Sequence, residues 1–149
     1  MFAPPPNQTD YITFLYNVVG IPTAALPSDS IYIATSLAVS MEWVNGKLSC
    51  ASGLLYVLAV YNLAADRLIN YAQDVNGQTY FEALRAKLNL NQPIYGVVSS
   101  TSDESTSTSL LNTEAMKNMT VGDLQNMQTP YGREYLAIAQ SVGTLWGLT

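Results

Sequence analysis

Hydrophobic residues recur at helical spacing along most of the chain, and one long segment lacks this period. The first predicted helix follows a proline-rich arm over residues 1–8, has Thr9 as its N-cap and ends at Gly20. Residues 9–149 are expected to form a single, mainly helical domain, because a chain of this length rarely divides into two. The second predicted helix has one apolar face, made of Ile31, Ala34, Leu37, Ala38, Met41 and Val44.

The later helices differ in how apolar they are. The third, over about residues 52–74, is apolar on all sides in its first half, so residues 54–65 are expected to be covered on every side by other helices or by neighbouring subunits. The fourth is predicted over about residues 78–90. The last helix is predicted to begin with Thr129 as its N-cap and Pro130 in its first turn.

From residue 91 to residue 128 the helical period is lost, and Ser and Thr accumulate. A loop of this length is unusual inside a compact domain and is commonly functional. Its composition favours an extended loop or β-hairpin with a turn at residues 102–104, and short helical turns are expected at residues 113–118 and 120–128. The predicted fold class is therefore mainly α: a small bundle of four to five helices with a long extended loop or β-hairpin before the last helix.

Charged residues make up only 11% of the chain and apolar residues 48%, whereas ordinary soluble domains carry about 25% charged residues. A globular domain with so few charges hides much of its surface. The longest apolar stretch, residues 54–65, is shorter than the roughly 20 residues that a membrane helix needs. We therefore expect burial against other subunits and no membrane segment. The net charge of −5 argues against nucleic acid as a specific ligand.

The residue types give no support for catalysis, a cofactor or a metal site. There is no histidine, which excludes Ser-His-Asp triads and imidazole ligands, and Cys50 has no second cysteine to pair with. The stretch at residues 74–77 resembles part of a calcium loop but lacks the later ligands, so a helix-ending turn explains it better. Asp66 and Arg67 form either a buried charge pair or a pair in which Arg67 points to solvent or to a neighbouring chain.

The chain has ten tyrosines. Tyrosine is favoured in subunit interfaces, where its ring is removed from water and its hydroxyl contacts water or a partner. With the shortage of charge, they favour a subunit of an assembly; the alternative is a monomer with a tyrosine-rich core. The residues expected at such an interface are Val97, Val98, Ser99, Ser100, Thr101, Ser102, Asp103, Glu104, Tyr131, Tyr135 and Trp146.

The order of the parts is itself informative. An alanine- and leucine-rich helix at residues 54–65 precedes the Ser/Thr-rich loop at residues 96–104, which is followed by the stretch Thr129-Pro130-Tyr131-Gly132-Arg133-Glu134-Tyr135. This order, over about residues 30–149, resembles the head-to-tail adaptor proteins of tailed bacteriophages. The sharpest element of the resemblance is Thr-Pro-Tyr-Gly at residues 129–132.

The resemblance implies a structural virion protein of the head–tail junction, made in the host cytoplasm and without enzymatic activity. Members of that family form a cyclic homo-oligomeric ring, typically dodecameric, docked beneath the portal protein and above the tail or nozzle protein. DNA passes through the channel without specific binding, which suits an acidic chain. A fibre-attachment or tail-end adaptor subunit, and a soluble helical binding module with a pocket under the tyrosine-rich faces, are the alternatives.

Overall fold

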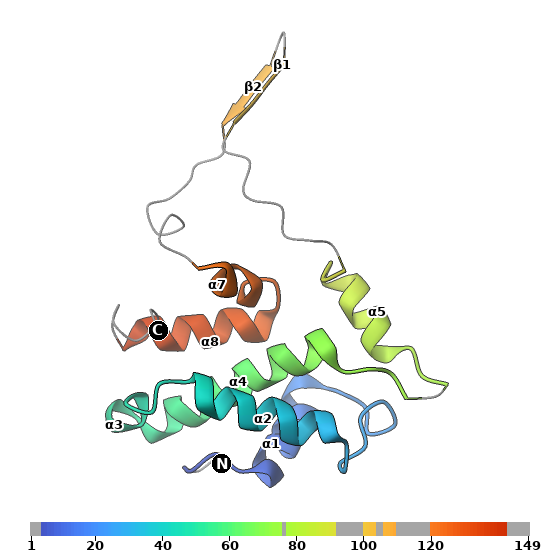
Figure 1. Cartoon of the computed structure of the whole chain (residues 1–149), viewed down its shortest axis with the longest axis vertical. Coiled ribbons are helices and arrows are strands. Elements are labelled where there is room, and N and C mark those ends of the chain that lie inside the picture. The colour runs from blue at the N-terminus through green and yellow to red at the C-terminus, as the bar shows by residue number, and fades with distance from the viewer. Residues whose placement is uncertain (1–3, 76, 92–99, 104–105, 110–119, 143–149) are drawn as a thin grey trace.

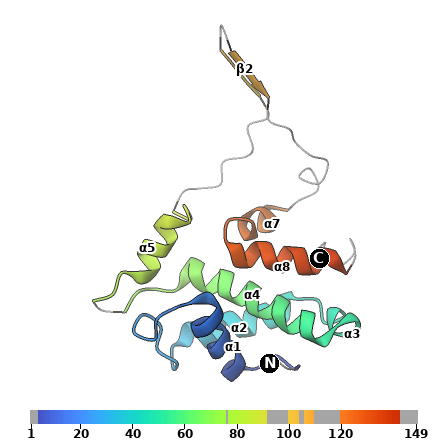
Figure 2. The same cartoon turned by 180° about the vertical axis from the view of Figure 1, so that it is seen from behind.

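The computed structural model describes residues 4–75, 77–91, 100–103, 106–109 and 120–142. These residues form a mainly helical body, as predicted. The long helix α4 (Gly53–Tyr71) runs through its middle, and α8 (Pro130–Ser141) lies along one side of α4 (Figure 1). The opposite side of α4 is covered by α1 (Gln8–Phe14) and α2 (Ile31–Trp43), in both views (Figures 1 and 2).

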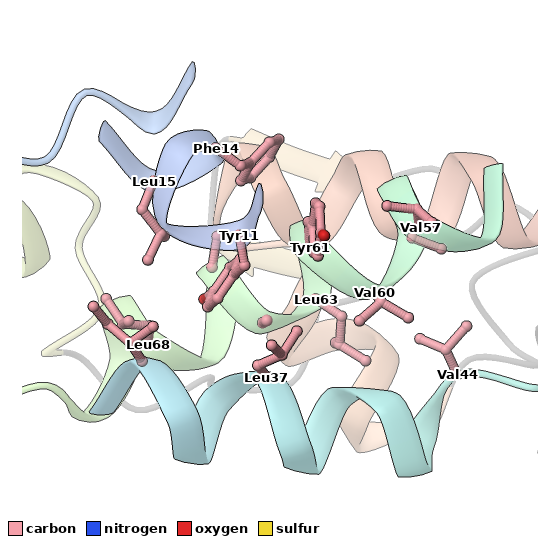
Figure 3. Packing of buried hydrophobic residues seen from close by; sticks show 14 of the residues in the cluster. Tyr11, Phe14, Leu15, Leu37, Val44, Val57, Val60, Tyr61, Leu63 and Leu68 are labelled. Atoms are coloured by element: carbon pink, nitrogen blue, oxygen red, sulfur yellow. The ribbon is translucent and has the colours of Figure 1, made fainter. Parts of the chain in front are cut away.

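The hydrophobic core lies where α1 and α2 meet α4 (Figure 3). The ring of Tyr61 from α4 packs against the rings of Tyr11 and Phe14 from α1, with centroids 5.5 and 5.8 Å apart. Leu37 of α2 and Leu63 of α4 lie on the other side of the same cluster. The side chains in this cluster are almost fully removed from water, and their burial is the main source of the body's stability.

The expected cover around residues 54–65 is complete only in the second half of that range. Residues 59–65 are all buried, but Leu54 is 44% exposed and Leu58 is half-buried. The first turn of α4 lies next to α3 (Leu48–Ala51) at one end of the body, so fewer elements surround it there (Figure 1). Within the chain, the cover therefore does not extend to the first turns of this helix, and their cover by a neighbouring subunit stays a prediction.

The predicted apolar face of α2 is also wrong. Leu37 and Val44 are buried, but Ile31 is 73% exposed and Met41 is 38% exposed. The face that contacts α4 instead carries Ile33, Ser36, Leu37 and Ser40. Small serines let two helices approach closely, and Ser36 remains satisfied because its hydroxyl donates to the Ile33 carbonyl and lies 3.1 Å from the Tyr11 hydroxyl.

The first helix begins two residues earlier than predicted. Its N-cap is Asn7 rather than Thr9, and the Asn7 side chain accepts a hydrogen bond from the Asp10 amide at 2.8 Å. The helix continues into the π-helical turn η1 (Leu15–Val19), which ends as predicted at Gly20, whose φ of +81° favours glycine. The N-terminal arm packs on the body, since Pro6 is buried and Asn7 exchanges two hydrogen bonds of 3.1 Å with the Tyr61 hydroxyl.

The fourth helix, α5 (Tyr80–Lys87), is shorter than predicted at both ends. The carboxylate of Asp74 accepts hydrogen bonds from the amides of Phe81 and Glu82, at 2.8 and 2.9 Å. Asp74 therefore lies beyond the end of α4 and caps the next helix, so it does not serve as a helix-ending residue. Arg85 of α5 returns the contact by donating to the carbonyls at the end of α4 and just after it.

Within the predicted loop, two short strands pair as an antiparallel hairpin: β1 (Ser100–Asp103) and β2 (Thr106–Ser109). The expected turn at residues 102–104 lies partly in β1, because that strand continues to Asp103. The loop is also shorter than 91–128, since α7 (Val121–Asn126) is helical, as the expected turns at residues 120–128 allowed. A reciprocal capping box between Thr120 and Asp123 starts this helix. The turns expected at residues 113–118 lie outside the described residues.

Candidate interaction surfaces

The hairpin of β1 and β2 lies away from the helical body in both views (Figures 1 and 2). Its register pairs Ser100 with Ser109 and Asp103 with Thr106. In an antiparallel pair every second residue of each strand turns its N–H and C=O away from the partner strand. Among the described residues no third strand pairs with either edge, so both edges offer backbone hydrogen-bonding groups.

The predicted interface residues divide into three groups. Ser100, Thr101, Ser102 and Asp103 form strand β1. Tyr131 and Tyr135 lie on α8, which packs along α4, so the structure does not bring them together with the hairpin (Figure 1). The remaining predicted residues lie outside the described part of the chain: Val97, Val98, Ser99, Glu104 and Trp146.

The two tyrosines of α8 pack partly against the core of their own chain. Tyr131 is half-buried, and its hydroxyl donates to the carbonyl of Val19 at 3.3 Å. Tyr135 is half-buried near Asp123 and Arg67. Burial raises the pKa of both tyrosine hydroxyls above the ordinary value.

The stretch Thr129-Pro130-Tyr131-Gly132 forms the corner between α7 and α8. Thr129 is the N-cap of α8, as predicted, and its hydroxyl accepts from the Gly132 amide at 2.9 Å. Pro130 occupies the first turn of the helix. A Cβ on Gly132 would lie 2.0 Å from the carbonyl oxygen of Asn126, so no side chain fits there. The four residues thus have packing roles within the chain.

Asp66 of α4 ties this corner to the centre of the body. Its carboxylate accepts a hydrogen bond from the Thr129 hydroxyl, and the residue is only 3% exposed. Burial raises the pKa of Asp66 to about 6, although the hydrogen bond from Thr129 and the charge of Arg67 act in the opposite direction. The interpretation as a buried charge pair does not describe the structure, because Asp66 bonds to Thr129 of α8 and Arg67 lies over the Trp43 ring of α2. A contact of Arg67 with a neighbouring chain stays a prediction.

A surface that the sequence did not reveal lies on the outward side of α2. Ile31, Val39, Met41 and Trp43 are each at least 36% exposed, and the guanidinium of Arg67 lies 4.1 Å from the centroid of the Trp43 ring. Large exposed apolar residues on one short helix are typical of protein–protein contact. The misassigned face of α2 concealed this surface, because the pattern placed Ile31 and Met41 inside.

The described residues hold no cluster of three or more acidic, cysteine or histidine side chains suited to a metal ion. None of the described helices has the length and apolar character needed to cross a membrane. Comparison of the chain with family models, with curated proteins and with solved structures finds no match.

Proposed function

We propose that this chain is a head-to-tail adaptor of a tailed bacteriophage, a virion subunit of a ring that connects the portal to the tail and forms part of the DNA channel. The observation that carries the proposal is the β1–β2 hairpin, which lies away from the helical body with both edges unpaired within the described part of the chain. A hairpin of this kind gains backbone partners by adding to a strand of another chain.

The composition of the hairpin supports a partner outside the chain. Its strands, Ser100–Asp103 and Thr106–Ser109, carry short polar side chains and contribute no apolar residue to a core. An isolated two-stranded hairpin is at best marginally stable in water. Ordering the long connections to it is also unfavourable. Contact with a neighbouring adaptor subunit, the portal or a tail protein supplies the missing stabilisation.

The helical body supports assembly through a second feature. The exposed apolar residues of α2 are the kind of surface that subunits of a ring cover, and a ring needs two different faces on each subunit. This feature favours the adaptor over a soluble binding module. The net charge of −5 suits a channel through which DNA passes without binding, because an acidic protein repels the phosphates.

The test is a deletion made in the genome that encodes the chain, where the proposal expects portal and capsid genes beside it. Residues 99–109 are replaced by a short glycine bridge, and particles are counted by electron microscopy. The body should still fold, because the hairpin does not belong to its core, and heads should accumulate without tails. Exchange of Thr101 and Thr108, a cross-strand pair, for alanine keeps the loop length and is the matched control, which should still assemble full tails. Full tails and normal infection by the deleted phage would contradict the proposal.

A further inference from the structure

Arg67 has an unused binding capacity. Its guanidinium lies over the Trp43 ring, its Nε is buried without a hydrogen-bond partner, and no described residue accepts a hydrogen bond from the group. Arg85 and Arg133, by contrast, donate to backbone carbonyls of their own chain. A guanidinium carries five N–H donors in a fork that matches a carboxylate. Arg67 therefore lacks an acceptor, and a carboxylate is the group that fits best.

The surroundings of Arg67 have the composition of an interface centre. Trp43 is 60% exposed and Val39, one turn away on α2, is 36% exposed. Farther along the same two helices, the rings of Tyr32 and Tyr71 lie 6.2 Å apart. Arg67 and Tyr71 are four residues apart on α4 and so share a face. Arginine and aromatic side chains at the middle of an apolar patch carry most of the binding energy in many protein interfaces.

The chain itself contains a complementary acidic element. Asp103 is the last residue of β1, and Glu104, outside the described residues, follows it in the sequence. Between Lys87 and Lys117 the sequence has no Lys or Arg, so no cation of this segment neutralises the pair. The hairpin lies away from its own body in both views (Figures 1 and 2), so its acidic end can meet a cation of another copy. Among the described cations, Arg67 is the one that lies over an exposed aromatic ring.

We propose that Arg67, Trp43 and Val39 form a docking site for the acidic end of the hairpin, Asp103 and Glu104, from a second copy of this chain. The choice of a second copy rests on the proposed function, which requires contacts between identical subunits. The contact is heterologous, because the docking site and the hairpin are different parts of the chain. Each copy gives one hairpin and receives another, and such contacts form a ring when the rotation between neighbouring copies closes. Salt should weaken the contact, because its centre is an ion pair.

The test uses Trp43 as the reporter. The chain has two tryptophans, so the full-length Trp146→Phe variant fluoresces from Trp43 alone. It is titrated with a peptide of residues 98–111 closed by a terminal disulfide. Two control peptides are used: one with Asp103→Asn and Glu104→Gln, and one with the acidic sequence scrambled. We expect a saturable change in Trp43 fluorescence, with at least about tenfold tighter binding of the natural peptide than of either control.

The same titration on two further variants locates the site. Arg67→Gln should weaken binding about tenfold, whereas Arg133→Gln on α8 should leave it unchanged. Circular dichroism measures whether both variants fold. If Arg67→Gln does not fold, the neutral peptide still tests the ion pair, because it is titrated against the chain with Arg67 intact. Equal binding of the natural and neutral peptides, or no response up to about 1 mM, would overturn the ion pair. Equal binding of the scrambled acidic peptide would overturn the choice of a second copy.

The titration requires neither a portal nor a ring, so its result is separate from that of the proposed function. A chain that joins the portal but does not bind the peptide is an adaptor with a different subunit contact. A chain that binds the peptide but never joins a portal self-associates in another setting.

Discussion

The hydroxyl of Thr129 donates a hydrogen bond to the carboxylate of Asp66, which lies 63 residues earlier in the chain. The same hydroxyl accepts from the Gly132 amide, so a single oxygen both caps α8 and fixes it to α4. The start of the last helix is thereby held against the centre of the body, at the point where the chain returns from the hairpin.

Replacing Asp66 by Asn should remove a pH dependence of stability. The pKa of Asp66 is raised to about 6 in the folded chain, above its value of 3.8 when unfolded. The folded chain therefore binds more protons between these values, and the free energy of unfolding falls as pH rises from about 4 to about 6.5, by on the order of 3 kcal/mol. The chain has no histidine that titrates in the same range.

The measurement is urea denaturation of the natural chain and of Asp66→Asn at several pH values. The stability of the natural chain relative to the variant should decrease across this range, because the Asn amide can accept from Thr129 without carrying a charge. Gln140→Ala, a change at an exposed and uncharged position on α8, is the control and should show a constant difference. A constant difference for Asp66→Asn as well would contradict the account of the buried carboxylate.

Two glycines should respond in opposite ways to alanine. At Gly132 the added Cβ would meet the Asn126 carbonyl oxygen at 2.0 Å, so α7 and α8 must separate, at a cost of about 2–4 kcal/mol. At Gly122, inside α7, the nearest atom would be 3.7 Å away, and alanine should stabilise the helix by about 0.5–1 kcal/mol. Thermal unfolding followed by circular dichroism measures both; equal melting temperatures would be inconsistent with the corner as described.

The uneven cover of α4 predicts different costs for two leucines on the same helix. Leu63 is 1% exposed, and its replacement by alanine should lower the free energy of unfolding by about 2–5 kcal/mol through lost contacts and a cavity. Leu54 is 44% exposed, and the same change there should cost less than about 1 kcal/mol. Guanidinium denaturation of the two variants provides the comparison. A large cost at Leu54 would show that a neighbouring subunit covers the first turn in solution.

The N-terminal arm should loosen when the hydroxyl of Tyr61 is removed. This hydroxyl accepts from the amide of Asn7 and donates to its carbonyl, both at 3.1 Å. Tyr61→Phe should therefore cost about 1 kcal/mol and speed hydrogen exchange of the Asn7 amide at least about tenfold. Tyr56→Phe, a half-buried position whose hydroxyl has no hydrogen bond within the described residues, is the control. Unchanged exchange at Asn7 would contradict the docking of the arm.

Sequence patterns predicted the elements whose signals are local. Thr129 and Pro130 marked the start of α8, and Gly20 marked the end of the first helical segment, because a cap depends on a few adjacent residues. The loss of helical period located the segment that holds β1 and β2. The predominantly helical character followed from the same periodicity.

What depends on tertiary contact was not predictable in this way. The inward face of α2 was misassigned, because apolar and small residues surround that helix and only the serines at the α4 contact identify the buried side. Gly132 is required by the carbonyl of Asn126, which approaches it from the preceding helix. The contact between Arg67 and Trp43 joins two helices, and no spacing in the sequence indicates it.

The most direct measurement of the central claim is electron cryo-microscopy of the chain coexpressed with the portal protein that the proposed function expects in the same genome. A closed ring of this chain is expected on one end of the portal, with the hairpin of each copy against another chain. Deletion of residues 99–109 should leave the portal bare. A portal without added density, with the natural chain remaining monomeric in the same mixture, would contradict the assignment as a head-to-tail adaptor.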